Sequence, residues 1–198
     1  MSIIKTHDIN LYGKTAEYDL VLRPLSDEHL PYLYKWNADL EVLYWTESDI
    51  VNEPYDLETV NAIYGGVSQN ALCFLIEAND IPIGECWLQK MNLPHVSAMY
   101  SDELDVRRID FSIGEKAYWN KGIGTAFLRM LIEYAFTGEN VDVLHCFNDD
   151  YNVRSTRMWE KHGFTRILEE PLMPQPQKGK WQYHWRLTKE EYVMKSEK

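Results

Sequence analysis

The chain has 198 residues, 45% of them hydrophobic, which suits a single domain built around one core. It carries 31 acidic against 20 basic side chains, a net charge of −11 that repels phosphate backbones and excludes nucleic acid as an expected partner. No segment approaches the ~18 consecutive apolar residues of a membrane span and no signal peptide is evident, so we expect a cytoplasmic protein without a membrane partner.

The first predicted elements are a strand and a helix. Residues 18–25 alternate polar and apolar side chains, which is typical of a half-buried strand. Ser26 then offers an N-cap for a helix over residues 27–36. The aromatic and acidic segment 42–47 is predicted to be irregular, and residues 1–17 are expected to form a loosely packed extension.

A second helix and a hairpin follow. The helix is predicted over residues 57–64 and is ended by the two glycines that come next. Residues 71–78 and 81–88 are predicted strands on either side of the short turn 79–80, which is the pattern of an antiparallel hairpin.

The middle of the chain is predicted to run from a strand through a turn into a helix. The strand covers residues 108–113, and from Gly124 onward apolar residues recur with helical spacing. Residues 141–147 are the next predicted strand. The helix after Gly124 is therefore expected to be amphipathic and to lie between two strands.

The last part of the chain adds a helix over residues 152–162 and a strand over residues 181–187. Residues 171–179 contain three prolines and are predicted to form a loop, while 189–198 should be a loosely packed helix or tail. Since strands and helices are mixed, the class is α/β or α+β, in one domain over residues 1–198.

The segment Tyr118-Trp-Asn-Lys-Gly-Ile-Gly-Thr125 is the main candidate for ligand binding. Gly122 and Gly124 allow the backbone to approach a ligand closely, and the free N–H groups at a helix start suit a pyrophosphate. The segment is neither a G-x-x-x-x-G-K-[ST] loop nor a dinucleotide G-x-G-x-x-G motif. A phosphate-containing cofactor is therefore expected, although two glycines before a helix also occur in purely structural turns.

This loop is followed 28 residues after Gly124 by Asn152-Val-Arg-Ser-Thr-Arg-Met-Trp-Glu-Lys-His-Gly-Phe164. The two motifs, in this order and at this spacing, resemble the GNAT superfamily of N-acetyltransferases over about residues 70 to 168. The resemblance implies an α/β (α+β) GNAT fold, with a central, mixed, mostly antiparallel sheet of about seven strands flanked by helices. That sheet should be splayed between its fourth and fifth strands.

The resemblance also implies that acetyl-coenzyme A is the cofactor, with coenzyme A as a product, and it assigns two groups of cofactor-binding residues. The first group covers the strand end and the glycine loop: Phe111, Ser112, Ile113, Trp119, Asn120, Lys121, Gly122, Ile123, Gly124 and Thr125. The second group lies around the later motif: Asn148, Asn152, Ser155 and Trp159.

Within the superfamily, Arg108-Ile-Asp-Phe-Ser-Ile-Gly-Glu115 leading into the glycine loop is similar to aminoglycoside 6′-N-acetyltransferases. That likeness implies an antibiotic-resistance activity and carries a catalytic role to Asp110, beside the reacting amine. An amine of the lysine type is almost wholly protonated at neutral pH, and freeing its lone pair costs about 4–5 kcal/mol, so a nearby carboxylate base is useful. Asp110 as an ordinary hydrogen-bonding residue at a strand end is the alternative.

The acceptor is expected to be a polycationic small molecule, held by carboxylates and aromatic walls. The candidate substrate-binding residues are Tyr44, Trp45, Glu85, Trp87, Gln89, Asp102, Glu103, Asp105, Asp149 and Asp150. Solvated loop faces are the alternative for the acidic ones.

Two positions depart from the wider family. Trp119 stands where Gln or Arg is usual, as in GNAT enzymes that acetylate amino termini of ribosomal proteins. Trp159 replaces a Tyr that protonates the leaving thiolate in many relatives, and an indole N–H is no useful acid. A peptide amino terminus, a polyamine, a siderophore-like amine, and a non-catalytic module that binds acyl-coenzyme A therefore remain alternative functions.

Other chemistries have little support in the sequence. Neither Cys86 nor Cys146 lies in a Cys/His pattern that would indicate an acyl-carrying nucleophile, so direct attack by the amine is preferred. The cysteines are expected to be buried thiols. None of the six histidines has a metal-ligand spacing, so no metal is assigned, and His145 is expected to be structural. A monomer and a homodimer are both compatible with the sequence.

Overall fold

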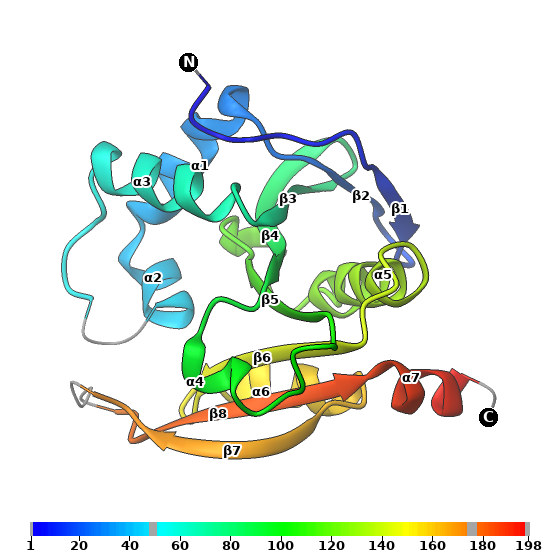
Figure 1. The fold of residues 1–198 in the computed structure, drawn as a ribbon. Coiled ribbons are helices and arrows are strands. Elements are labelled where there is room, and N and C mark those ends of the chain that lie inside the picture. The colour runs from blue at the N-terminus through cyan, green and yellow to red at the C-terminus, as the bar shows by residue number, and fades with distance from the viewer. Residues whose placement is uncertain (1, 48–50, 174–177, 197–198) are drawn as a thin grey trace. The chain divides into compact units, whose positions relative to one another are not determined.

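The computed structural model describes residues 2–47, 51–173 and 178–196 (Figure 1). Its strands are β1 (Leu11–Lys14), β2 (Asp19–Pro24), β3 (Ala71–Ala78), β4 (Ile81–Lys90), β5 (Val106–Ser112), β6 (Val143–Asp149), β7 (Thr165–Pro171) and β8 (Trp181–Thr188). Its α-helices are α1 (Leu30–Asn37), α2 (Leu40–Thr46), α3 (Leu57–Val67), α4 (Pro94–Ser97), α5 (Ile123–Thr137), α6 (Val153–Lys161) and α7 (Lys189–Ser196). Two short 3₁₀ turns lie at Asp27–His29 and Lys116–Tyr118.

The strands follow the order β1-β2-β3-β4-β5-β6-β8-β7 as hydrogen-bonded neighbours. The pairs β1/β2, β2/β3, β6/β8 and β7/β8 are antiparallel, and β5/β6 is parallel. The mixed, mostly antiparallel sheet is therefore confirmed, with eight strands in place of about seven. The expected splaying between the fourth and fifth strands stays a prediction.

The chain divides into two compact units, each made of two separate segments. The first unit comprises Met1–Leu88 and Asp110–Leu131, and the second comprises Gln89–Ile109 and Ile132–Lys198. The expectation of one domain over residues 1–198 stays a prediction beside this division.

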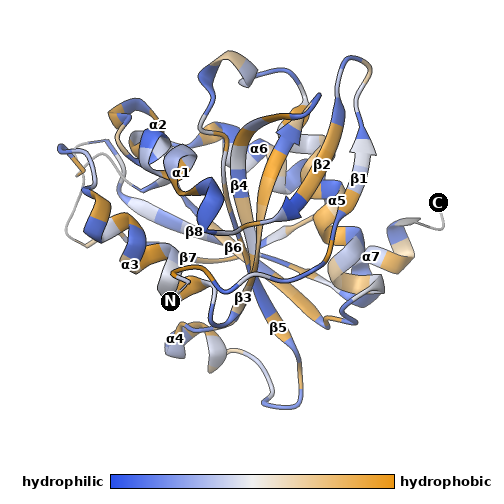
Figure 2. Ribbon diagram, turned by 90° about the horizontal axis from the view of Figure 1, so that it is seen from above, coloured by the Kyte–Doolittle hydropathy of each residue, from blue (hydrophilic) through white to orange (hydrophobic). Residues whose placement is uncertain are grey.

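The core of the first unit lies where α1 and α3 meet β3. Both helices carry hydrophobic and hydrophilic residues along their length, as Figure 2 shows, so each can bury one face. The buried side chains of this core are Ile4, Leu25, Leu30, Leu33, Trp36, Val60, Tyr64, Val67, Cys73 and Leu75. Residues 1–17 were predicted to form a loosely packed extension. That prediction is wrong around Ile4, which belongs to this core and is only 1% exposed.

Two tight backbone arrangements position β4. Asn79 and Asp80 have φ angles of 50° and 62°, the left-handed pair that a two-residue hairpin turn requires, and this confirms the predicted turn. Gly84 lies directly against β5, because a Cβ at this position would come within 2.1 Å of the Ser112 carbonyl oxygen. Only glycine allows the backbones of β4 and β5 to lie this close.

The second unit contains the strands β6, β8 and β7 and the first part of β5, up to Ile109. Cys146 pairs with Trp185 and Leu144 with Leu187 across β6 and β8, so buried side chains face each other along this ladder. The tail prediction is partly confirmed, since Lys189–Ser196 is the helix α7. Its Tyr192 ring lies 5.0 Å from the ring of Phe136, which ties the helix to its unit.

Several element predictions need correction. The segment 42–47 is helical, not irregular, because the Asp39 side chain accepts the N–H of Glu41 and caps α2. The helix expected to end at Tyr64 continues through both glycines to Val67. The lack of a side chain at Gly65 serves packing instead, because a Cβ there would lie 3.3 Å from the Ile3 carbonyl oxygen.

Three elements were not predicted at all: β1, α4 and β7. β1 pairs with β2 through four residue pairs. β7 pairs with β8, although every residue of β7 is exposed or half-buried. The loop predicted over residues 171–179 begins inside β7, and residues 174–177 lie outside the described residues.

We expect the Asp39 cap to be measurable. Asp39→Ala should lower the free energy of unfolding by about 1 kcal/mol, the usual cost of losing an N-cap, because the first N–H groups of α2 then lack a partner. Asp39→Asn is the matched control: it loses the 2.7 Å ion pair with Lys116 but keeps a capping oxygen. Urea denaturation of both variants measures the difference, and equal stability of the two would contradict a capping role.

Candidate active site

A pocket opens in the first unit beside the ends of β4 and β5. Its walls come from α1, the end of α2, α3 and the two strands. The lining residues are Trp36, Asn37, Val42, Thr46, Glu47, Ile63, Tyr64, Glu85, Trp87, Asp110, Phe111 and Ser112. The pocket therefore combines three carboxyl groups with four aromatic side chains.

Asp110 lies in this pocket, half-buried on β5. Its Oδ2 atom accepts a hydrogen bond of 2.8 Å from the indole Nε1 of Trp87, which is two residues along β4 from Glu85. The Trp87 ring is in turn held by an edge contact with Tyr64, at 6.0 Å between ring centroids. The neutral indole N–H of Trp87 thus holds the Asp110 carboxylate in place within the pocket.

Glu85 lies in the same pocket but is only 4% exposed, and its Oε2 atom has no hydrogen-bond partner among the described residues. Burial raises the pKa of Glu85 well above the ordinary value of a glutamate, and the negative charges of Asp110 and Glu47 raise it further. Burial therefore favours the protonated form of Glu85. A protonated carboxyl can donate a hydrogen bond but cannot accept the proton of an amine.

The glycine loop also lies in the first unit. Gly122 has a φ angle of 75° and no atom lies within 4 Å of the place where a Cβ would stand, so its surface is open. α5 begins at Ile123, and its first N–H groups have no partner within the helix. Open backbone before the start of a 15-residue helix is the arrangement that binds phosphate groups.

Trp119 and Lys121 flank this loop with contacts that the sequence did not reveal. The Trp119 Nε1 atom donates a 2.6 Å hydrogen bond to the Ile113 carbonyl oxygen, which anchors the loop to the end of β5. The Lys121 ammonium donates to the Tyr18 hydroxyl at 3.1 Å and lies 5.5 Å from the centroid of the Tyr118 ring. Trp119 therefore has a structural role here beside any contact with a ligand.

The second group of predicted cofactor residues lies in the second unit, around the start of α6. Asn152 caps α6 by accepting the backbone N–H of Ser155 at 3.2 Å. Asn148 accepts the indole N–H of Trp185 at 2.8 Å and donates to Thr156. Trp159 is 2% exposed and packs against Phe164. Their roles toward a cofactor stay predictions.

The acidic residues of the second unit are largely used by the fold. Both Asp105 oxygens accept hydrogen bonds from Arg107, which hold the pKa of that carboxyl below its ordinary value. Asp150 accepts the N–H of Lys180 at 3.1 Å, and Asp149 ends β6. Asp102 and Glu103 are exposed in the turn before β5. A substrate role for these five residues stays a prediction.

The predicted acceptor residues are therefore only partly brought together. Glu85, Trp87 and Asp110 share the pocket, whereas Tyr44 and Trp45 lie on α2 without lining it and Gln89 is buried in the second unit. Sequence reasoning missed Trp36, Tyr64 and the α2 residues Val42 and Thr46. A helical reading of residues 40–46 would have placed Val42 and Thr46 on one face, four residues apart.

The cysteines offer no nucleophile. All three are buried and none forms a disulfide in the described part of the chain, and burial raises the pKa of the Cys86 thiol well above its ordinary value, which opposes thiolate formation. Within the described part of the chain, every helix is too short or too polar to cross a bilayer.

The sequence matches the model of the "Acetyltransferase (GNAT) domain" over residues 19–165. It is 26% identical to a spermidine N(1)-acetyltransferase of Escherichia coli (strain K12), over 80% of this chain and 78% of that protein. It is 27% identical to an aminoglycoside N(6')-acetyltransferase type 1 of Klebsiella pneumoniae, over 74% of each chain.

Solved structures share the fold at low identity. A GNAT-family acetyltransferase from Bacillus anthracis is 18% identical, with a TM-score of 0.69 over 91% of this chain and 100% of that chain. The aminoglycoside acetyltransferase AAC(6')-Ib in complex with coenzyme A and kanamycin is 21% identical, with a TM-score of 0.70 over 89% of this chain and 99% of that chain.

The raised pKa of Glu85 predicts an unusual pH dependence of stability. The folded chain keeps the Glu85 proton above the unfolded pKa of about 4.3, so the free energy of unfolding falls as the pH rises from there toward the folded pKa. Glu85→Gln removes this loss. In urea denaturation between about pH 5 and pH 8, the variant should gain stability over the parent chain, and the gain should grow with pH.

Glu77→Gln is the matched control on the neighbouring strand. Glu77 is also buried, at 8% exposed, but its carboxylate is paired with Arg23 at 2.8 Å. Its amide variant should lose stability over the same pH range because Arg23 then lacks its partner. A Glu85→Gln gain that shrinks with increasing pH would show that Glu85 is ionised in the folded protein.

Proposed function

Because this chain belongs to the GNAT acetyltransferase family, we propose that it transfers an acetyl group from acetyl-coenzyme A to a primary amine, most specifically the 6′ amine of an aminoglycoside. The observation that carries the proposal is Asp110, oriented by Trp87 in a pocket one strand before the glycine loop. The amine attacks the thioester directly, and no covalent acyl-enzyme forms.

The residues of the glycine loop fit a cofactor that carries a pyrophosphate. The open backbone at Gly122 and the first N–H groups of α5 would hold that group, and when bound, acetyl-coenzyme A supplies an activated acetyl thioester. Backbone N–H groups of Phe111, Ser112 and Ile113, at the end of β5, are the candidates to polarise the thioester carbonyl.

Asp110 takes the proton of the acceptor. Neutralising an ammonium of the lysine type at neutral pH costs about 4–5 kcal/mol, and a carboxylate at the pocket reduces this cost by attracting the ammonium and accepting its proton. Glu85 and Glu47 also line the pocket, but the raised pKa of Glu85 keeps its proton in place. Of Glu85 and Asp110, which lie on neighbouring strands, Asp110 is therefore the proposed base.

The pocket suits an acceptor with several charges and some apolar surface. Carboxylates at Asp110 and Glu47 attract ammonium groups, and the rings of Trp36, Tyr64 and Trp87 can pack against a sugar face or an alkyl chain. A polyamine is the second candidate, and the likeness to the Escherichia coli spermidine enzyme favours it. We also propose a cytoplasmic enzyme, which the three free cysteines support.

A thiol-release assay tests the acceptor. Acetyl-coenzyme A is supplied with kanamycin, spermidine, spermine or a peptide with a free amino terminus, and the product is analysed by mass spectrometry and NMR. The proposal expects fastest turnover with kanamycin and acetylation at the 6′ nitrogen. Faster turnover with spermidine would replace the aminoglycoside by the polyamine, and cofactor binding without turnover of any amine would favour a binding module.

For the base, we expect Asp110→Asn to lower kcat by about 10²–10⁴-fold, the range for general-base catalysis, if proton transfer limits the rate. The amide keeps an oxygen for the Trp87 N–H, so the pocket retains its shape. Affinity for acetyl-coenzyme A, measured by calorimetry, should stay nearly constant, and higher pH should partly restore kcat because more of the amine is already neutral.

Glu85→Gln is the control for the Asp110 variant. Because Glu85 already holds its proton, its amide should retain most of the kcat at neutral pH. A Glu85→Gln variant that loses as much kcat as Asp110→Asn, or an Asp110→Asn variant with the parent kcat, would remove Asp110 from the role of base.

For the glycine loop, acetyl-coenzyme A should raise the Tm of the parent chain, since a ligand that binds only the folded state stabilises it. Gly122→Val should abolish this rise, because a side chain fills the open space and the φ angle of 75° strains any L-residue. Gly66→Ala, also at an open position but inside α3, should keep the full shift. An unchanged shift in folded Gly122→Val would move the cofactor site elsewhere.

A further inference from the structure

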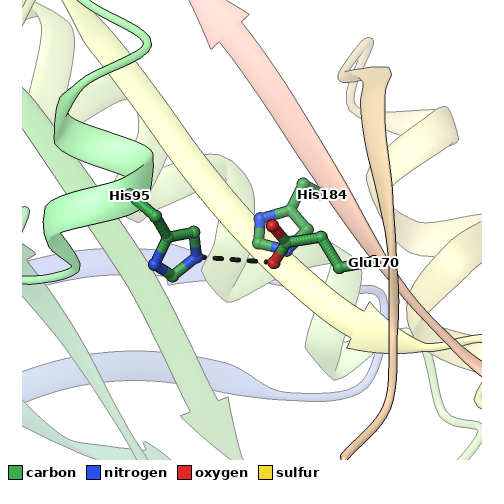
Figure 3. Close-up of side chains that lie close together, drawn as sticks. All are labelled: His95, Glu170 and His184. Atoms are coloured by element: carbon green, nitrogen blue, oxygen red, sulfur yellow. Dashed lines mark ion pairs between the residues drawn. The ribbon is translucent and has the colours of Figure 1, made fainter.

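Three side chains converge in the second unit from segments far apart in the sequence. His95 comes from α4, Glu170 from β7 and His184 from β8, and all three point toward one another in Figure 3. The Glu170 Oε2 atom lies 3.4 Å from the His95 Nε2 atom and 3.2 Å from the His184 Nε2 atom. One ligand atom from each residue lies within 4.8 Å of the others.

His184 is the most informative member of this group. Its side chain is 0% exposed, and its Nε2 atom makes no hydrogen bond of acceptable geometry, although it lies beside the Glu170 carboxylate. A buried ring nitrogen without a hydrogen bond is costly unless something else binds its lone pair or its proton. The nitrogen is directed into the cluster, where Glu170 and His95 supply two more donor atoms.

The opposite edge of the His184 ring is held by a second buried imidazole. The Nδ1 atom of His184 lies 3.0 Å from the Nε2 atom of His145, and the Nδ1 atom of His145 lies 3.0 Å from the Tyr100 hydroxyl. If the His184 Nδ1 atom carries the hydrogen, it donates to His145, which can then donate to the Tyr100 oxygen. This arrangement leaves a lone pair on the His184 Nε2 atom, as ligand histidines require.

The spacing of the donor atoms matches that of metal ligands. Two ligands at 2.0–2.1 Å from a tetrahedral zinc ion lie roughly 3.3 Å from each other. The distances from Glu170 to His95 and to His184, 3.4 Å and 3.2 Å, agree with this value. His95 has an exposed side chain, at 52%, and can adjust to complete the third ligand position.

We infer that His95, Glu170 and His184 form a binding site for a divalent transition-metal ion, with Zn²⁺ as the best-suited ion and a fourth position open to water. Two imidazole nitrogens and one carboxylate oxygen are a ligand set that zinc accepts. His145 and Tyr100 are positioning residues, since they act only through the His184 ring. The bound ion would link the segment between β4 and β5 to the β7–β8 pair within the second unit.

The sequence did not indicate this site because its members follow no short spacing. His95 and Glu170 are separated by most of the second half of the chain, and Glu170 and His184 come from two different strands. Pairing of β7 with β8, which places Leu168 opposite His184 and Glu170 opposite Gln182, brings the last two together.

The test uses the full-length, tag-free chain after treatment with a chelator. Zn²⁺ is titrated in competition with a fluorescent zinc indicator, and the Tm is measured with and without one equivalent of Zn²⁺. We expect one ion per chain and a higher Tm with zinc. Co²⁺ should give visible absorption bands of a four-coordinate site with nitrogen and oxygen ligands.

Variants then assign the ligands. His95→Ala and Glu170→Gln change partly exposed positions and should weaken Zn²⁺ binding at least about 100-fold. Loss of a residue that only hydrogen-bonds to a metal ligand already weakens binding by about 10–100-fold, and loss of a ligand should cost more. Tyr100→Phe should weaken it by about 10–100-fold through the His145 ring. Glu169→Gln, the neighbour that pairs with Arg166, is the matched control and should bind like the parent.

Two results would overturn the inference. One is the absence of stoichiometric Zn²⁺ binding to the parent chain, which would leave Glu170 as an ordinary partner of two imidazoles. The other is equal affinity in the parent, His95→Ala and Glu170→Gln variants, which would place the ion at another site. Neither result depends on acetyl transfer, so the proposed function is tested separately.

Discussion

The close approach of β4 to β5 at Gly84 is the constraint on which the pocket depends. With no side chain at this position, the Ser112 carbonyl can lie where a Cβ would otherwise be 2.1 Å away. Residues just beyond Gly84 on β4 are thereby placed level with the end of β5, and the Trp87 indole reaches Asp110 at 2.8 Å. Any larger residue at Gly84 would separate the two strands and move the donor from the carboxylate it orients.

The three carboxylates of the pocket differ because their surroundings differ. Glu85 is buried with one oxygen lacking a hydrogen-bond partner among the described residues, and burial raises its pKa well above the ordinary value. Asp110 has a fixed donor and Glu47 is exposed at the end of α2. Protonation of one acid lowers the electrostatic repulsion among the carboxyl groups of such a pocket.

The sequence predicted the elements with strong patterns and missed those that depend on contacts. The hairpin turn at Asn79-Asp80 and the helix after Gly122 have local signals, and the structure has both. α2 and β7 have mixed polarity, and contacts that the sequence does not reveal help to stabilise them, among them the Asp39 cap of α2 and the pairing of β7 with β8. In the pocket, Asp110 came from a family likeness, whereas Tyr64 could not be found because its position depends on how α3 packs on β3.

The missing tyrosine at Trp159 does not by itself argue against catalysis. A thiol has a pKa near 8.5, so protonation of a departing thiolate from solution buffered at pH 7 is favourable by about 2 kcal/mol. For the acceptor amine, the proton transfer is unfavourable and its free energy is larger, because loss of the ammonium proton at neutral pH costs about 4–5 kcal/mol. Removal of the proton from the amine is therefore the step that benefits most from a catalytic side chain. The buried indole of Trp159 does not affect that step. Asp110, the base that we propose, lies in the pocket and would act on the proton transfer that has the larger cost.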